Sequence, residues 1–118
     1  MGVADPLIQA TLLAEAVDNG PVAIFVVGDD LRYVAVNRSA CELLGYEREE
    51  LLDLTAREVM PELDMHEHLL QAIRDRRSRG RWTLRRKDGE PVEVEFRASE
   101  ASVAGMPYLV SACWAVGG

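Results

Sequence analysis

The side chains that could do chemistry in this chain are few and scattered. Ser39, His66 and several carboxylates are of the types that act as nucleophile, general base and general acid in enzymes. The sequence around them has no nucleophile elbow, phosphate-binding loop or metal-binding motif. Cys41 and Cys113 match no metal-site spacing, and two cysteines cannot make a disulfide framework. We therefore expect neither catalysis nor a bound metal.

Charge argues against nucleic acid as the main partner, because the net charge of the 118-residue chain is −7. Positive charge is nonetheless concentrated, since eight of the 13 Lys and Arg residues lie in one stretch: Arg74, Arg76, Arg77, Arg79, Arg81, Arg85, Arg86 and Lys87. Two interpretations of this stretch stay open. It is either a solvated helix end and strand face or a docking patch for an acidic partner surface.

The sequence predicts a single domain in the cytoplasm. A chain of 118 residues is long enough for one hydrophobic core. It has no run of 18 apolar residues, so we expect no membrane insertion. Asp5 stands where a secretory signal would carry positive charge, which speaks against export.

The first element expected is a flanking helix within residues 1–20. Asp5 and Pro6 supply an N-cap and a first helical residue, and an Asn-Gly-Pro sequence ends the helix. Its apolar residues lie on or beside one stripe: Ile8, Leu12, Leu13, Ala16 and Val17. The helix has no place in a central core, so its stripe needs a cover. That cover is the chain's own sheet or a second copy, and we predict a homodimer.

A hairpin and a short helix follow. Residues 22–27 and 31–36 are rich in β-branched and aromatic side chains, and a Gly-Asp-Asp turn separates them. Ser39 and Glu42 have the form of a capping box, and Gly45 suits the end of the helix that they begin.

The middle of the chain is expected to be helical. Helical turns are predicted over residues 49–54 and 56–60. A longer helix is predicted from Asp64 to about Arg77, with Gly80 as the residue that breaks it.

The last third predicts three strands, over residues 81–86, 92–98 and 108–116. An Asp-Gly turn joins the first two, and an Ala-Gly-Met-Pro segment joins the last two. The final strand is apolar on both faces in its middle, which is typical of a central strand. We therefore expect an antiparallel sheet in the order 2-1-5-4-3, with the helical insert on one face.

These elements, in this order, resemble a PAS domain, a small module of signalling proteins. The resemblance covers residues 14–114, and its carriers are residues 23–27, 33–37, 40–46, 49–52, 85–89 and 92–96. It implies an α+β fold with a five-stranded antiparallel sheet, helices on one face and an N-terminal amphipathic flanking helix. The PAS domain would span residues 21–116, with 117–118 as a tail or truncation point. Such domains bind a small molecule or relay a signal, and they often dimerise through an N-terminal helix.

The resemblance also raises haem and flavin as cofactors, and the residues speak against both. Haem-binding relatives use a histidine on the long helix, where His66 lies at the edge of the apolar stripe. The position that corresponds to their ligand is Arg74, and arginine does not ligate iron. No Asn-Cys-Arg-Phe-Leu-Gln sequence of a flavin photosensor is present.

The cupped side of the sheet is the candidate site for a small hydrophobic or weakly polar ligand. Its apolar candidates, taken from strand parity and helix faces, are Ile24, Val26, Val36, Leu44, Leu51, Val59, Met60, Met65, Leu69, Trp82, Leu84, Val94, Phe96, Val110 and Ala112. The same residues could simply fill a core. His66 and Asn37 are the polar candidates, although for Asn37 we favour a turn residue that bonds local backbone amides.

Three functions stay open. The first is a signalling module that senses a small apolar ligand, or relays a partner's state through dimer packing, to an attached output domain. The second is a ligand-free dimerisation or protein-interaction module. The third is a haem or flavin sensor.

Overall fold

The computed structural model describes residues 5–60 and 77–116. Along the chain its elements are α1 (Pro6–Asp18), β1 (Ala23–Val27), β2 (Tyr33–Val36), α2 (Arg38–Leu44), α3 (Arg48–Leu52), α4 (Ala56–Val59), β3 (Arg77–Arg85), β4 (Pro91–Val103) and β5 (Met106–Ala115). The helix expected from Asp64 lies outside the described residues. None of the described helices is long and apolar enough to cross a membrane.

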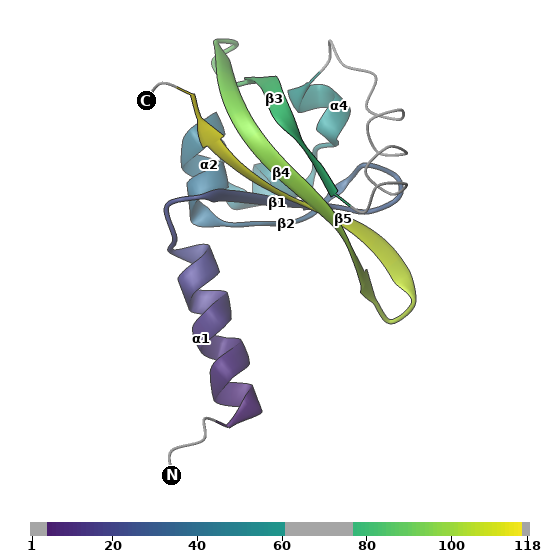
Figure 1. Ribbon diagram of the computed structural model, residues 1–118. Coiled ribbons are helices and arrows are strands. Elements are labelled where there is room, and N and C mark those ends of the chain that lie inside the picture. Colours follow the sequence, from purple (N-terminus) through teal and green to yellow (C-terminus); the bar gives the residue numbers. More distant parts are fainter. Residues whose placement is uncertain (1–4, 61–76, 117–118) are drawn as a thin grey trace.

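The five strands form one antiparallel sheet in the order β2-β1-β5-β4-β3, which confirms the predicted topology. β5 lies between β1 and β4, as expected for a strand that is apolar on both faces. α2 contacts β1 and α3 contacts β2, so the short helices cover one face of the sheet. α1 projects away from this body (Figure 1).

The hairpins follow from their turn residues. Ala104 and Gly105, between β4 and β5, both have positive φ, of 52° and 80°. Two consecutive residues of this kind make the turn whose twist suits an antiparallel hairpin. Gly89, between β3 and β4, has a φ of 89°, and its N–H donates to the Arg86 carbonyl at 2.9 Å. The Asp-Gly turn predicted there is confirmed.

Two local predictions are wrong. Gly80 does not break a helix but lies inside β3, paired with Phe96 of β4. The long pairing between the two strands outweighs the local signal of the glycine. The helix α2 begins at Asn37, whose side chain accepts a hydrogen bond from the Ala40 N–H at 3.0 Å, rather than at a Ser39 capping box. Gly45 does end α2, in the left-handed conformation, as predicted.

Candidate functional site

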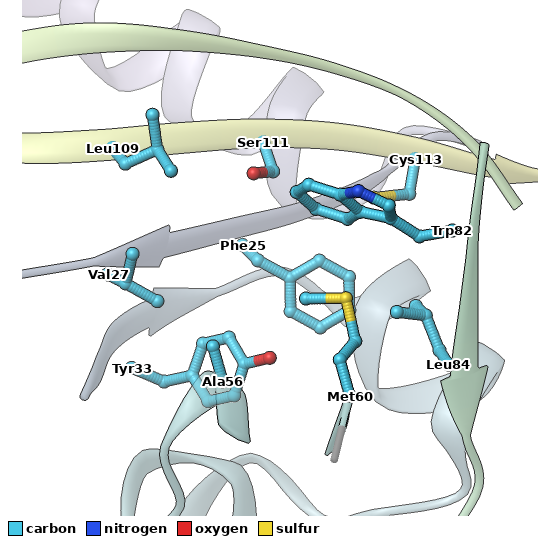
Figure 2. A pocket seen from close by; sticks show the side chains of 10 residues that line it. All are labelled: Phe25, Val27, Tyr33, Ala56, Met60, Trp82, Leu84, Leu109, Ser111 and Cys113. Carbon is cyan, nitrogen blue, oxygen red and sulfur yellow. The ribbon is translucent and has the colours of Figure 1, made fainter. Parts of the chain in front are cut away.

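A small cavity lies between the sheet and the short helices. Four strands (β1, β2, β3 and β5) and the α4 segment supply its lining, which consists of Phe25, Val27, Tyr33, Ala56, Met60, Trp82, Leu84, Leu109, Ser111 and Cys113 (Figure 2). The volume of the cavity is about 20 Å³. A space of this size is close to the room that one water molecule needs.

Sheet register brings the lining together. β1 pairs with β5 so that Phe25 lies opposite Ser111 and Val27 lies opposite Leu109. The start of β2 is joined to the α3–α4 segment by the backbone, because the Tyr33 N–H donates to the Leu54 carbonyl at 3.2 Å. The Tyr33 and Phe25 rings lie 5.5 Å apart, centroid to centroid, and together supply aromatic surface to the lining.

The lining is chemically neutral. Tyr33 and Ser111 are buried, with 5% and 7% of their surfaces exposed, and both hydroxyls point into the cavity (Figure 2). Neither hydroxyl hydrogen-bonds to another residue in the described parts of the chain. Burial raises the pKa of the Tyr33 hydroxyl well above its usual value, with a smaller contribution from Cys113. Burial also raises the pKa of the Cys113 thiol to about 12, so both groups keep their protons at neutral pH.

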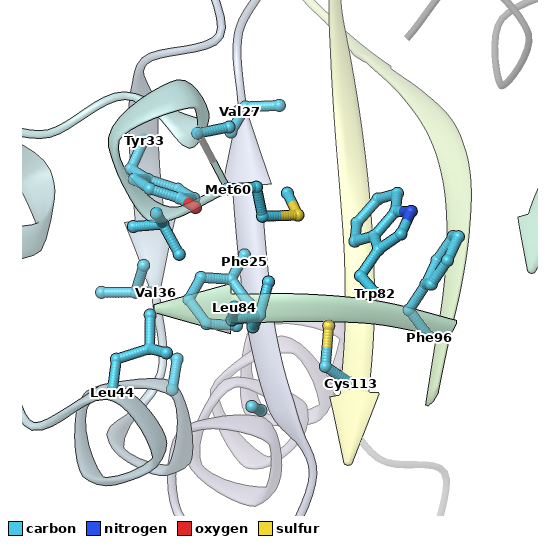
Figure 3. Packing of buried hydrophobic residues seen from close by; sticks show 14 of the residues in the cluster. Phe25, Val27, Tyr33, Val36, Leu44, Met60, Trp82, Leu84, Phe96 and Cys113 are labelled. Carbon is cyan, nitrogen blue, oxygen red and sulfur yellow. The ribbon is translucent and has the colours of Figure 1, made fainter. Parts of the chain in front are cut away.

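Three of the predicted pocket residues line the cavity: Met60, Trp82 and Leu84. Six more are buried in the core that surrounds it: Val36, Leu44, Leu51, Val59, Val94 and Phe96 (Figure 3). Trp82 stacks on Phe96 with ring centroids 3.6 Å apart, which closes the side of the core near β3. Met65, His66 and Leu69 lie outside the described residues.

The predicted parity of two strands is wrong. In β1 the residues buried under the helices are Ala23, Phe25 and Val27, whereas Ile24 and Val26 are only half-buried and do not line the cavity. In β5 the cavity takes Leu109, Ser111 and Cys113, and Val110 and Ala112 fall on the other face. Both strands are apolar on both faces, so alternation of hydrophobicity carried no information on which face is inward.

Seven lining residues were absent from the prediction: Phe25, Val27, Tyr33, Ala56, Leu109, Ser111 and Cys113. One signal for β5 was present in the sequence. Ser111 is a hydroxyl residue inside an otherwise apolar strand, which makes it a polar candidate for a pocket, but the sequence alone does not tell which face of the sheet it lies on.

Asn37 joins elements rather than facing the cavity. It is 4% exposed, and its side-chain oxygen accepts hydrogen bonds from the N–H groups of Ile24, at 2.8 Å, and Ala40, at 3.0 Å. Its side-chain nitrogen donates to the carbonyls of Val17, at 2.7 Å, and Val22, at 2.8 Å. The side chain is therefore fully engaged with backbone, as we favoured, although its partners reach well beyond the local turn.

α1 exposes the stripe that was predicted to need a cover. Ile8, Leu12, Leu13, Ala16 and Val17 are all exposed, and no residue of α1 is buried. Leu7 has 74% of its surface exposed and adds an apolar residue that the prediction missed. Of the two covers expected, the chain's own sheet is not the one used, because the helix projects away from it (Figure 1).

The C-terminal end of α1 is attached to the body at three points. Asn37 holds the Val17 carbonyl, as described above. The Ser39 hydroxyl donates to the Gly20 carbonyl, and Arg48 at the start of α3 forms an ion pair with Asp18. Asn37 and Ser39 belong to the α2 start, so this end of α1 is attached to β1, α2 and α3 together.

Helices packed on one face of an antiparallel 2-1-5-4-3 sheet, around a small interior cavity, define the PAS class of fold. The sequence agrees, because residues 11–105 match the family described as "PAS fold". The chain therefore belongs to the PAS family. No curated protein matches the chain.

Solved structures of PAS domains are similar to this chain over nearly its whole length. A PAS domain from a two-component sensor histidine kinase gives a TM-score of 0.84 at 16% identity, covering 94% of this chain and 99% of that one. The PAS domain of an HTR-like protein from Haloarcula marismortui gives 0.80 at 24% identity, covering 93% and 94%. A domain of a sensory box sensor histidine kinase/response regulator from Geobacter sulfurreducens gives 0.77 at 21% identity, covering 95% and 98%.

Proposed function

We propose that this chain is a non-catalytic, cytoplasmic sensory module of a larger signalling protein, and that it relays a partner's state through the packing of a dimer formed by α1. The observation that carries the proposal is the apolar face of α1, exposed over its whole length and fixed to the body at one end only. A helix of this kind is stable when a second apolar surface covers it.

The attachment of α1 suggests how the relay works. Asn37 hydrogen-bonds to Val17 of α1 and to Ile24 of β1. A change in the angle of α1 would therefore also shift β1. Two dimer packings with different α1 angles would then correspond to two arrangements of β1 in the sheet. A partner or an output domain that prefers one arrangement shifts the population toward it.

The structural neighbours of the chain support this proposal. The structural neighbours include PAS domains of sensor histidine kinases, which supports an output domain elsewhere in the protein. The proposal places the chain in a reducing compartment, where cysteines such as Cys41 and Cys113 stay as thiols.

The oligomeric state tests this proposal. Leu12→Glu combined with Leu13→Glu places two carboxylates on the exposed stripe, and we expect it to convert a dimer to a monomer in light scattering coupled to size exclusion. Val103→Glu is the matched control, because Val103 is an equally exposed apolar residue at the far β4–β5 end. A wild-type chain that stays monomeric at all concentrations would refute the proposal.

Ligand sensing is a second candidate, and the Tyr33 and Ser111 hydroxyls favour it. They are the hydrogen-bonding groups of two buried residues, and they face a mostly apolar cavity. The ligand would be small and uncharged, because no charged side chain lines the cavity. At about 20 Å³ the cavity must open to admit it, since pockets for drug-sized ligands measure roughly 300–1,000 Å³.

Native mass spectrometry of the chain purified from cells tests this candidate. A bound small molecule appears as added mass that is lost on denaturation. Ser111→Val removes one hydroxyl at nearly constant volume and should release the molecule, while Ser102→Val on the exposed part of β4 should not. A spectrum without added mass favours the relay function without a ligand.

A further inference from the structure

The outer face of the sheet, opposite the short helices, carries a second hollow. It lies over β3, β4 and β5 and has a volume of about 410 Å³. Its lining residues are Arg79, Gly80, Arg81, Glu95, Phe96, Arg97 and Trp114. We call this hollow the arginine groove. It has no connection with the interior cavity, because its side chains come from strand positions of the opposite parity.

The charges of the arginine groove are unbalanced at one place. Arg81 lies opposite Glu95 in the register, and its guanidinium is 3.4 Å from Glu95 and 3.8 Å from Glu93. Two residues further along each of these strands, on the same face of the sheet, Arg79 lies directly opposite Arg97. Like charges directly opposite each other destabilise an antiparallel sheet, whereas opposite charges stabilise it. In the described ranges, 5–60 and 77–116, neither Arg79 nor Arg97 has an ion pair or hydrogen bond from its side chain.

Trp114 completes the groove with an apolar surface. Its indole N–H donates to Glu95 at 2.9 Å, which fixes the ring beside the arginines while 38% of the residue stays exposed. Glu95 thus bridges Trp114 and Arg81 and leaves Arg79 and Arg97 to an outside group. Tryptophan and arginine side by side are the residue types that dominate binding energy at protein interfaces.

We propose that the arginine groove docks an acidic segment of a partner protein, with a carboxylate between Arg79 and Arg97 and an apolar side chain on Trp114. A carboxylate in that position would convert the like-charge pair into a bridged arrangement with charge-assisted hydrogen bonds. Nucleic acid fits the groove less well, because the chain as a whole carries a net charge of −7 and Glu93 and Glu95 adjoin the site.

The test uses the chain as it is and two synthetic peptides. One is rich in glutamate around a central leucine, and the other has glutamine at each glutamate position. The readout is the NMR signal of the Trp114 indole N–H, followed during titration and at rising salt. We expect a saturable shift with the glutamate peptide that weakens with salt, and no saturation with the glutamine peptide.

Arg97→Glu separates binding from folding. It places a carboxylate opposite Arg79, so the thermal midpoint should stay equal or rise. Affinity for the glutamate peptide should fall by roughly tenfold or more, because the site then holds its own acid. Arg57→Glu is the matched control, with the same change of net charge on the exposed surface of α4, and it should bind as the wild type does.

Four outcomes would overturn the proposal. If the glutamine peptide binds as tightly as the glutamate peptide, charge plays no role in binding. If Arg57→Glu lowers the affinity for the glutamate peptide as much as Arg97→Glu does, the effect comes from net charge and not from the arginine groove. Competition by inorganic phosphate or duplex DNA at the strength of the peptide would show a general anion site. A change in oligomeric state in Arg97→Glu would show that a second copy of the chain covers this face.

Discussion

Asn37 is the residue on which the attachment of α1 depends most. Its four hydrogen bonds satisfy two backbone N–H groups and two carbonyls from three parts of the chain: the end of α1, the start of β1 and the first turn of α2. Truncation to alanine leaves all four groups without this partner inside the protein. Each buried polar group that loses its partner costs about 1–3 kcal/mol. Asn37→Ala removes the partner of four such groups at once, so the destabilisation should be larger than for the loss of a single hydrogen bond.

We predict that Asn37→Ala lowers the free energy of unfolding by about 3 kcal/mol, measured by urea denaturation with circular dichroism. Asn19→Ala is the control, because the Asn19 side chain bonds only to Glu15 on an exposed helix end, and its effect should stay within about 0.5 kcal/mol. Similar losses for the two variants would show that the Asn37 bonds contribute little.

The Cys113 thiol predicts how stability depends on pH. Burial raises its pKa from 9.0 to about 12 in the folded chain, so the folded chain holds this proton where the unfolded chain has lost it. The stability from Cys113 is therefore complete below pH 9 and is lost as the pH rises toward 12. From about pH 8 to about pH 10 the loss is about 1.4 kcal/mol.

Urea denaturation of the wild type and of Cys113→Ala at those two pH values measures this loss. Burial, the main cause of the raised Tyr33 pKa, is common to both proteins, and Tyr33 stays protonated in the folded state over this interval, so their difference reports mainly the thiol. We expect the alanine variant to lose about 1.4 kcal/mol less than the wild type across the interval. Parallel pH profiles would mean that the thiol titrates alike in the folded and unfolded chains.

At the scale of elements, we expect replacement of glycine by alanine to have opposite effects on stability at Gly45 and at Gly80. Gly45 ends α2 with a φ of 80°, a conformation that costs a residue with a Cβ about 1 kcal/mol. Gly80 lies within β3, and a Cβ there would meet Phe96 at an ordinary distance of 3.4 Å. Replacing glycine by alanine at such a site stabilises the folded protein, because alanine lowers the conformational entropy of the unfolded chain.

We therefore predict that Gly45→Ala lowers the free energy of unfolding by about 1 kcal/mol and that Gly80→Ala raises it by about 0.5 kcal/mol. Thermal and urea denaturation measure both effects. Two changes of the same sign would contradict the backbone argument, since the side chain added is identical.

The elements show where the sequence was sufficient. Strand order and hairpins could be predicted, because turn residues such as the Asp-Gly before Glu90 act locally and a strand that is apolar on both faces must be central. The face of β1 that points inward could not, since Phe25 and Ile24 are both apolar and only tertiary packing separates them. The α2 start was misplaced for a similar reason. Asn37 and Ser39 both suit a cap, and a distant partner, the Gly20 carbonyl, engages Ser39.

The candidate site was predictable in outline only. The cupped face and its Trp82, Leu84 and Met60 follow from the resemblance and from strand alternation in β3, where arginines mark the outer face. The positions of the Tyr33 and Ser111 hydroxyls in the cavity could not be predicted from the sequence. Their orientation depends on the pairing of β1 with β5 and on the bond between Tyr33 and Leu54, which join segments far apart in the sequence.

At the scale of the whole molecule, the body and α1 differ in what stabilises them. The body has one continuous core that runs from Ala23 to Cys113. α1 has 13 residues, none of them buried, and isolated helices shorter than about 12–15 residues are marginal in water. Its stability therefore depends on its C-terminal attachment and on whatever covers its apolar face.

This difference predicts that hydrogen exchange in α1 depends on protein concentration. In a monomer, the N-terminal half of α1 should exchange fast, because only the end near Val17 is attached to the body. In a dimer formed through α1, the same amides should be protected, whereas amides of the central strand β5 should exchange at the same rate throughout. Hydrogen–deuterium exchange with mass spectrometry over a dilution series measures both regions in one sample. Protection of α1 that is independent of concentration would mean that the helix is stable without a second copy, and the dimer would then lose its main structural reason.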